Sequence, residues 1–217
     1  TAVPQLGGGH LDLQVLIHNT RTTPDLCRIS LVIDGAEADG SDRIEFVGTP
    51  TSLDVGASVT LTLTGDIPEV TPWSPDHPRL YTARLSLSVV RDSCVDVIDT
   101  RELRIGFRTI EAREGQLLLN GTPIFLTGFN RHEDSPNTAM RPDPQTTRHD
   151  LKAMKEAGAN FVRLCHYPHH PSELDLCDEL GLLAMAEIPL YWWGAQNEGP
   201  EALSSKLTAA RRQLEAL

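Results

Sequence analysis

Hydrophobic and polar residues alternate in short runs over the first half of the chain. From Leu11 to Ile17 an apolar residue stands at every second position, which is the period of a β-strand. Further strand-like runs, separated by Gly, Pro and Asp, follow at residues 27–34, 58–65, 80–90 and 99–107. Short strands at this spacing predict an immunoglobulin-like β-sandwich over residues 1–110, although the Cys…Trp…Cys pattern of antibody domains is absent.

A tight turn is indicated within residues 114–130. Asn120-Gly121 is a preferred pair for a two-residue type I′ turn, and apolar runs flank it on both sides. We therefore expect a β-hairpin whose second arm, from Ile124 to Gly128, leads into polar residues.

The periodicity changes in the second half of the chain. Helical patterns alternate with short apolar strands, in the order helix 146–160, strand 161–168, helix 171–181, strand 182–190 and helix 200–217. This alternation predicts a parallel sheet with crossover helices, and the apolar strands indicate burial on both faces. Residues 111–217 would form the first three units of a (β/α)8 TIM barrel, whose complete form needs about 250 residues.

Composition narrows the possible partners. The chain has 217 residues and a formal net charge of −11, which argues against nucleic acid as a partner. Apolar runs are too short for a membrane span, and the absence of a signal-peptide pattern favours a cytoplasmic location while leaving the compartment open. The four cysteines show no metal-binding spacing and are expected to be buried thiols.

Polar residues gather where the three expected barrel strands end. The segments are GFNRHED (128–134), RLCHYPHHP (163–171) and MAEIPLYWW (185–193). The carboxyl ends of barrel strands meet at one rim, where TIM-barrel active sites are built. Three such clusters in phase predict a functional site at this rim.

The sequence around these strand ends resembles glycoside hydrolase family 2. NFVRLCHYPHHPSELDLCDELGLL (160–183) is similar to a long family signature, and GFNRHED to another strand end. TPWSPDHPRLYTARL (71–85) and RIGFRTIE (104–111) are similar to the link between sandwich and barrel. The resemblance implies a β-galactosidase- or β-glucuronidase-like enzyme that hydrolyses terminal β-glycosides with retention, using two carboxylates about 5 Å apart.

Carried over to this chain, the resemblance assigns roles to the rim residues. His166 and His132 would bind sugar hydroxyls and support the transition state. Arg163 would hold the catalytic nucleophile ionised and oriented. Glu187 would be a partner for one of the histidines, with a strand-end salt bridge as an equal alternative.

The remaining polar residues of the three segments are expected to support the site. Arg131 and Glu133 are interpreted as a supporting shell, and Tyr167 as a residue that fixes the turn. Trp192 is either a sugar-stacking platform or packing under a loop. His169 and His170 are expected to serve a surface loop or a helix start rather than the sugar.

The two catalytic carboxylates of the family are not expected among these residues. The resemblance places them after the fourth and seventh barrel strands, beyond Leu217, so the chain contributes no catalytic Glu and is expected to be inactive alone. Glu198 follows an Asn, but no apolar strand precedes it, and it is interpreted as the turn before the last helix.

No cofactor or metal is expected. Magnesium-dependent β-galactosidases of the family carry a Glu and a His where this chain has Tyr191 and Trp193. A metal-dependent hydrolase remains a minor alternative, and a non-catalytic carbohydrate-binding or scaffold module is the main one. The expected partner is a carbohydrate, the cleaved sugar stays open, and so does a homo-oligomeric parent enzyme.

Overall fold

The structure is a computed structural model with two compact units, Thr1–Ile124 and Phe125–Leu217. It describes residues 1–5, 8–35, 43–92, 94–136, 138–141, 143–190 and 199–216. Tyr191, Trp192, Trp193 and Glu198, which are discussed above, lie outside these residues.

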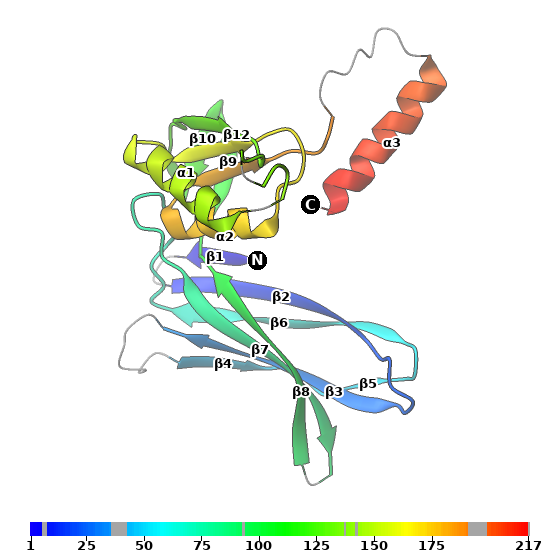
Figure 1. The fold of residues 1–217 in the computed structure, drawn as a ribbon. Coiled ribbons are helices and arrows are strands. Elements are labelled where there is room, and N and C mark those ends of the chain that lie inside the picture. The colour runs from blue at the N-terminus through cyan, green and yellow to red at the C-terminus, as the bar shows by residue number, and fades with distance from the viewer. Residues whose placement is uncertain are drawn as a thin grey trace. The chain divides into compact units, whose positions relative to one another are not determined.

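The first unit is a sandwich of two antiparallel sheets (Figure 1). One sheet has the order β1-β2-β6, formed by Ala2–Gln5, Gly8–His18 and Ser58–Pro68. The other has the order β4-β3-β7-β8, with β5 also paired to β3, and is formed by Arg43–Val47, Asp25–Asp34, Tyr81–Arg91, Cys94–Ile105 and Thr51–Leu53. The predicted sandwich is confirmed, while β1, β4 and β5 were not predicted.

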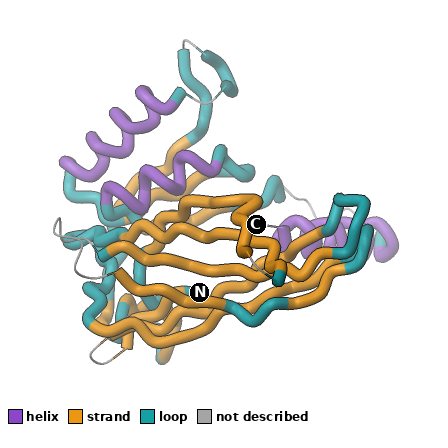
Figure 2. The backbone as a smooth tube through the Cα atoms, turned by 90° about the horizontal axis from the view of Figure 1, so that it is seen from below, coloured by secondary structure: helices purple, strands orange, loops and turns teal. Residues whose placement is uncertain are grey.

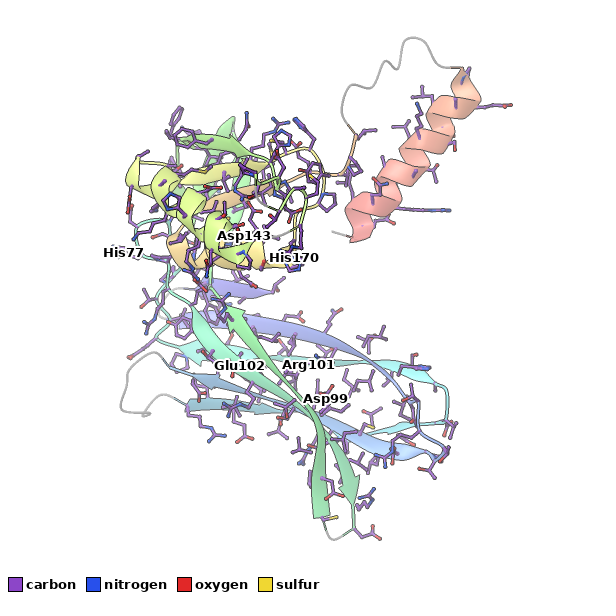
Figure 3. The ribbon with its side chains drawn as sticks, in the orientation of Figure 1. His77, Asp99, Arg101, Glu102, Asp143 and His170 are labelled. Carbon is purple, nitrogen blue, oxygen red and sulfur yellow. The ribbon has the colours of Figure 1, made fainter. Side chains whose placement is uncertain are left out.

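The alternating apolar residues of the sandwich form its core. Leu31 of β3 and Leu63 of β6 are both buried and belong to one hydrophobic cluster that draws on both sheets. The outermost strand β8 is exposed over nearly its whole length, and Figure 3 labels Asp99, Arg101 and Glu102 along it. The core therefore depends on β2, β3, β6 and β7 rather than on the edge.

A small third sheet contains the predicted tight turn. Its strands are β9 (Ile110–Arg113), β10 (Gln116–Leu119) and β11 (Thr122–Pro123). Asn120 and Gly121 have φ angles of 51° and 76°, as a type I′ turn requires. The expected second arm was wrong in extent, because β11 ends at Pro123. The predicted domain boundary after residue 110 stays a prediction, since these strands group with the first unit by contacts.

The second unit has a parallel sheet of order β12-β13-β14. Its strands, which share the orange colour of all strands in Figure 2, are Gly128–Arg131, Phe161–Leu164 and Leu183–Ala186. Helices α1 (Pro144–Glu156) and α2 (Pro171–Leu180) connect them, and α3 (Pro200–Ala216) follows. The predicted alternation is confirmed as the start of a TIM barrel.

One face of this parallel sheet packs on the helices. Leu151 of α1, Val162 and Leu164 of β13, and Leu176 of α2 form a buried cluster. Burial on both faces was wrong, because β13 alternates between buried and half-buried residues and most of β14 is exposed. The alternation arises because successive strand residues point to opposite faces and the described helices cover only one.

Local capping fixes where the two connecting helices begin and end. The carboxylate of Asp143 accepts hydrogen bonds from the backbone N–H groups of Gln145 and Thr146 at the start of α1. A hydrogen bond from the Thr146 hydroxyl is the main reason why the pKa of Asp143 lies below its usual value. Gly181 ends α2 in the left-handed region, with φ 73°.

The expectations for the cysteines and for membrane-spanning helices can be compared with the structure. Cys27, Cys165 and Cys177 are buried and free, as expected, whereas Cys94 is exposed on β8. Burial and the nearby Glu173 carboxylate raise the pKa of Cys177 to about 12. Among the described residues, every helix is too short or too polar to span a membrane.

Candidate sugar-binding site

The candidate site lies at the carboxyl ends of β12, β13 and β14. Pairing in the parallel sheet sets Asn130 opposite Arg163, and Arg163 opposite Met185. Glu187 follows the last residue of β14, and His132 follows the last residue of β12. The register of the sheet thus brings the predicted residues to one edge, as expected for ends of parallel strands.

Arg163 and Glu187 form the central ion pair. The Arg163 Nε atom donates to Glu187 Oε1 at 2.5 Å, and Nη2 donates to Oε2 at 3.2 Å. This two-point geometry is the strong form of an Arg–carboxylate pair. The hydrogen bonds from Arg163 lower the pKa of Glu187, outweighing the opposite effect of partial burial, and Glu187 in turn raises the pKa of Arg163. Glu187 is therefore an ionised hydrogen-bond acceptor.

His166 joins this pair through one ring nitrogen. Its Nδ1 atom lies 3.2 Å from Glu187 Oε2 and 3.2 Å from Arg163 Nη2. A single nitrogen cannot donate to the carboxylate and accept from the guanidinium together. Because Glu187 is ionised, the arrangement in which Nδ1–H donates to Oε2 satisfies both the carboxylate and the ring. Both alternatives expected for Glu187 are therefore present: it is a partner of His166, and it forms a strand-end salt bridge with Arg163.

His132 extends the cluster as an exposed ring. The centroids of the His132 and His166 rings lie 5.1 Å apart, with the rings nearly perpendicular. Tyr167 lies 6.2 Å from His132 and stacks on His169 at 5.1 Å. The Tyr167 hydroxyl oxygen accepts the backbone N–H of Glu133 at 3.3 Å. Tyr167 thereby joins the loop after β12 to the loop after β13, consistent with its expected role in fixing the turn.

Arg131 points to the helix side of the sheet and lies in a buried network. Its Nη1 atom donates to both carboxylate oxygens of Glu173, at 2.8 and 2.9 Å, and Nη2 reaches Thr147 and Asp150. The exposed fractions of the Arg131 and Glu173 side chains are 6% and 3%. Arg131 thus supports the strand ends from the face of the sheet that α1 and α2 cover, and it does not face the half-exposed Arg163 cluster.

His169 belongs to the same network, so of its two expected roles the surface loop was wrong, while its contact with Glu173 in the first turn of α2 fits the helix start. Its side chain is 1% exposed, with Nδ1 at 3.0 Å from Glu173 Oε2 and Nε2 at 3.0 Å from the Cys165 carbonyl oxygen. Burial alone would lower the pKa of His169, but the hydrogen bonds to Glu173 and Cys165 raise it overall. Since both partners are acceptors, the geometry suits the doubly protonated ring.

His170 and Glu133 support the start of α2. The His170 Nδ1 atom accepts the backbone N–H of Ser172 at 3.3 Å, so His170 is the N-cap of the helix (labelled in Figure 3). The Glu133 carboxylate accepts the backbone N–H of His170 at 2.8 Å. Both residues therefore act on the helix start, which fits the helix role considered for His170 and the supporting role considered for Glu133.

Three features of the site were missed in the sequence. Asn130 lies next to Arg163, with Oδ1 at 3.4 Å from Nη1, and the parallel register was the signal that could have found it. Glu173 was counted only as part of a helix, and nothing in its spacing indicates an ion pair with Arg131. Cys165 was treated as a buried thiol, yet it offers a potential metal-ligand atom within 4.8 Å of those of His132 and His166.

Comparisons with known proteins agree with this architecture. Residues 2–108 match the family model "Glycosyl hydrolases family 2", and residues 110–216 match "Glycosyl hydrolases family 2, TIM barrel domain". A β-galactosidase of Pectobacterium atrosepticum is 34% identical over 196 residues, which are 87% of this chain and 18% of that protein.

Solved structures give the same result. A β-glucuronidase of Bacteroides uniformis superposes with a TM-score of 0.74 at 26% identity, over 88% of this chain and 22% of that one. A GH2 β-galacturonidase from Eisenbergiella tayi, bound to galacturonate, gives a TM-score of 0.72 at 28% identity, over 87% and 32%. This chain spans less than a third of the length of each of these relatives. It belongs to glycosyl hydrolase family 2.

Proposed function

We propose that the chain supplies part of the sugar pocket of a retaining β-glycosidase that cleaves terminal β-galactosides or β-glucuronides. The observation that carries this proposal is the hydrogen-bonded group of Arg163, Glu187 and His166 beside His132 at the strand ends. The related proteins with β-galactosidase and β-glucuronidase names support the same class of reaction.

The chemistry of this group suits a sugar. Imidazole rings held in fixed positions offer donors and acceptors to hydroxyl groups, and Glu187 restricts the orientation of His166. Hydrogen bonds that strengthen as positive charge develops on the sugar ring lower the barrier rather than only the substrate's dissociation constant. Arg163 would act as a positioning residue, because its guanidinium already orients Glu187.

The acid/base and the nucleophile are assigned to residues outside this chain. Glu187 has both oxygens bound to Arg163, and ionisation makes it a poor acid. Glu173 is buried against Arg131, and Glu133 accepts the His170 N–H group. Each of these three carboxylates described at the strand ends thus already has a structural role, so we expect the 217-residue chain alone to be inactive.

The reading frame of the encoding gene is the first test. We expect apolar strands after Leu217, one followed by Asn-Glu and a later one bearing a second Glu. Continuation without such strands would instead favour a non-catalytic carbohydrate-binding or scaffold module.

Assays then test the activity and the sugar. The full-length protein should release nitrophenol from a β-galactoside or a β-glucuronide, and the preferred substrate identifies the sugar. His166→Ala should lower kcat/KM by about 10²-fold or more, whereas His77→Ala on the sandwich serves as the control and should not. Turnover by the 217-residue chain itself would contradict the assignment of the catalytic carboxylates.

A further inference from the structure

The loops that follow β12 and β13 bring two imidazoles and one thiol together. His132, Cys165 and His166 each offer a ligand atom, and these atoms lie within 4.8 Å of one another. His132 directly follows β12 and Cys165 directly follows β13, and the last residues of these strands, Arg131 and Leu164, are paired. We propose that this group, called here the His-Cys-His cluster, binds a borderline-soft divalent ion such as Zn²⁺.

The donor set fits that class of ion. Thiolate and imidazole ligands favour Zn²⁺ and related transition metals over Mg²⁺ or Ca²⁺, which prefer oxygen. Metal–sulfur and metal–nitrogen bonds of about 2.3 and 2.0 Å in a tetrahedron place ligand atoms roughly 3.3–3.6 Å apart. The cluster has to contract by about an ångström to reach that geometry. His132 is exposed, so rotation of its side chain can supply the movement.

The surroundings of His166 support a metal on its other ring nitrogen. Nδ1 faces the Glu187 carboxylate at 3.2 Å, and binding of the ion through Nε2 would preserve this hydrogen bond. A carboxylate behind a ligating histidine is the usual arrangement in metal sites, because it orients the ring and raises its basicity. The positive charge of Arg163 is matched by Glu187, and the thiolate that binding would create offsets part of the charge of the ion.

Cys165 would exchange one interaction for a stronger one. Its Sγ atom donates weakly to the Arg131 carbonyl oxygen at 3.3 Å. Metal binding removes the thiol proton, so uptake of the ion should release protons and weaken as pH falls. Three protein ligands leave a fourth position for water or another molecule, as in open zinc sites. His132 and His166 are also the imidazoles of the proposed sugar pocket, so an ion bound here would compete with the sugar, and ion binding is measurable without glycosidase activity.

The test uses the 217-residue chain and Co²⁺ alone, because cobalt reports its ligands by absorption. One equivalent should bind with a sulfur-to-cobalt charge-transfer band. Cys165→Ser should abolish this band, and His132→Ala should weaken binding by about tenfold or more. Cys94→Ser, which removes the exposed thiol on β8, is the matched control and should leave the band and the affinity unchanged.

Contrary outcomes are equally clear. A charge-transfer band that survives in Cys165→Ser, or disappears in Cys94→Ser, would overturn the assignment, as would the absence of stoichiometric binding. His132 is exposed, so His132→Ala keeps the test valid even if Cys165→Ser fails to fold. Unchanged affinity in His132→Ala would also overturn the three-ligand site.

Discussion

Arg163 and Glu187 are joined by two hydrogen bonds, Nε to Oε1 and Nη2 to Oε2, which link β13 to the residue after β14. The planar guanidinium reaches both oxygens together, which a lysine ammonium cannot do. His166 is bound to the same carboxylate. The orientation of His166 therefore depends on two residues that lie 24 positions apart in the sequence.

Arg163→Lys should raise the pKa of Glu187 toward its ordinary value. The hydrogen bonds from Arg163 are the main cause of the present lowering, and Lys would supply one flexible point contact in their place. Titration of the Glu187 carboxyl by NMR measures the effect. Arg148→Lys, which alters the exposed pair with Glu179, is the control and should not change Glu187. An unaltered Glu187 pKa in Arg163→Lys would show that the pair is not its cause.

Glu173→Gln should destabilise the second unit strongly. The substitution removes the buried charge partner of the Arg131 guanidinium and leaves only the more exposed Asp150 at 3.3 Å, which costs about 3 kcal/mol of unfolding free energy. Urea unfolding monitored by amide exchange at Val162, in the core of this unit, gives the value. Glu179→Gln on the same helix should cost less than about 1 kcal/mol, because its pair with Arg148 is exposed. Equal effects would argue against a buried ionic network.

The contribution of His169 to the stability of the second unit should be lost as pH rises from about 6.5 through the raised folded-state pKa. The folded-state pKa of His169 is raised, so its contribution is complete below the unfolded value of about 6.5 and is lost as pH passes the folded value. His169→Gln should therefore be most destabilising, relative to the natural chain, in acid, and the difference should shrink at alkaline pH. A difference that grows with pH would contradict the raised pKa.

Gly128→Ala should separate β12 from β13. A Cβ atom at Gly128 would lie 1.8 Å from the backbone oxygen of Phe161, which rotation of a side chain cannot relieve. We expect a loss of about 3 kcal/mol, at the upper end for overpacked sites, and earlier exchange of the β13 amides. Gly199→Ala, where a Cβ would meet nothing within 4 Å, should change stability little. Equal stability of the two variants would disprove the close approach.

Local patterns were enough to predict much of the fold. Period-two alternation located β2, β3, β6 and β7, because these strands bury one face in the sandwich core. β1, β4 and β5 are short and lack such a run, and their pairing depends on partners distant in sequence. The barrel strands were located but predicted too long, because the chain leaves the sheet after Leu164 and Ala186, while the predicted strands ran on to residues 168 and 190.

The candidate site was predictable where sequence position determines it. The ends of parallel strands meet at one edge of a sheet, so the positions of the strand ends in the sequence were enough to predict that His132, Arg163, His166 and Glu187 lie together. The buried network of Arg131, Glu173 and His169 was not predictable, because it depends on which way α2 turns its first residues. A charged residue in a polar stretch gives no sign in sequence that its side chain is buried.

The start of α2 has a practical consequence for anyone who would redesign the pocket. The loops contain residues of the open rim, such as His132 and His166, close in sequence to residues that hold the helix, such as Glu133, His169 and His170. A library that randomised both loops completely would therefore lose many folded members. Substitutions restricted to the rim residues would keep the start of α2 intact. The loops therefore contain some positions that can be varied to change specificity and others that must be kept for folding.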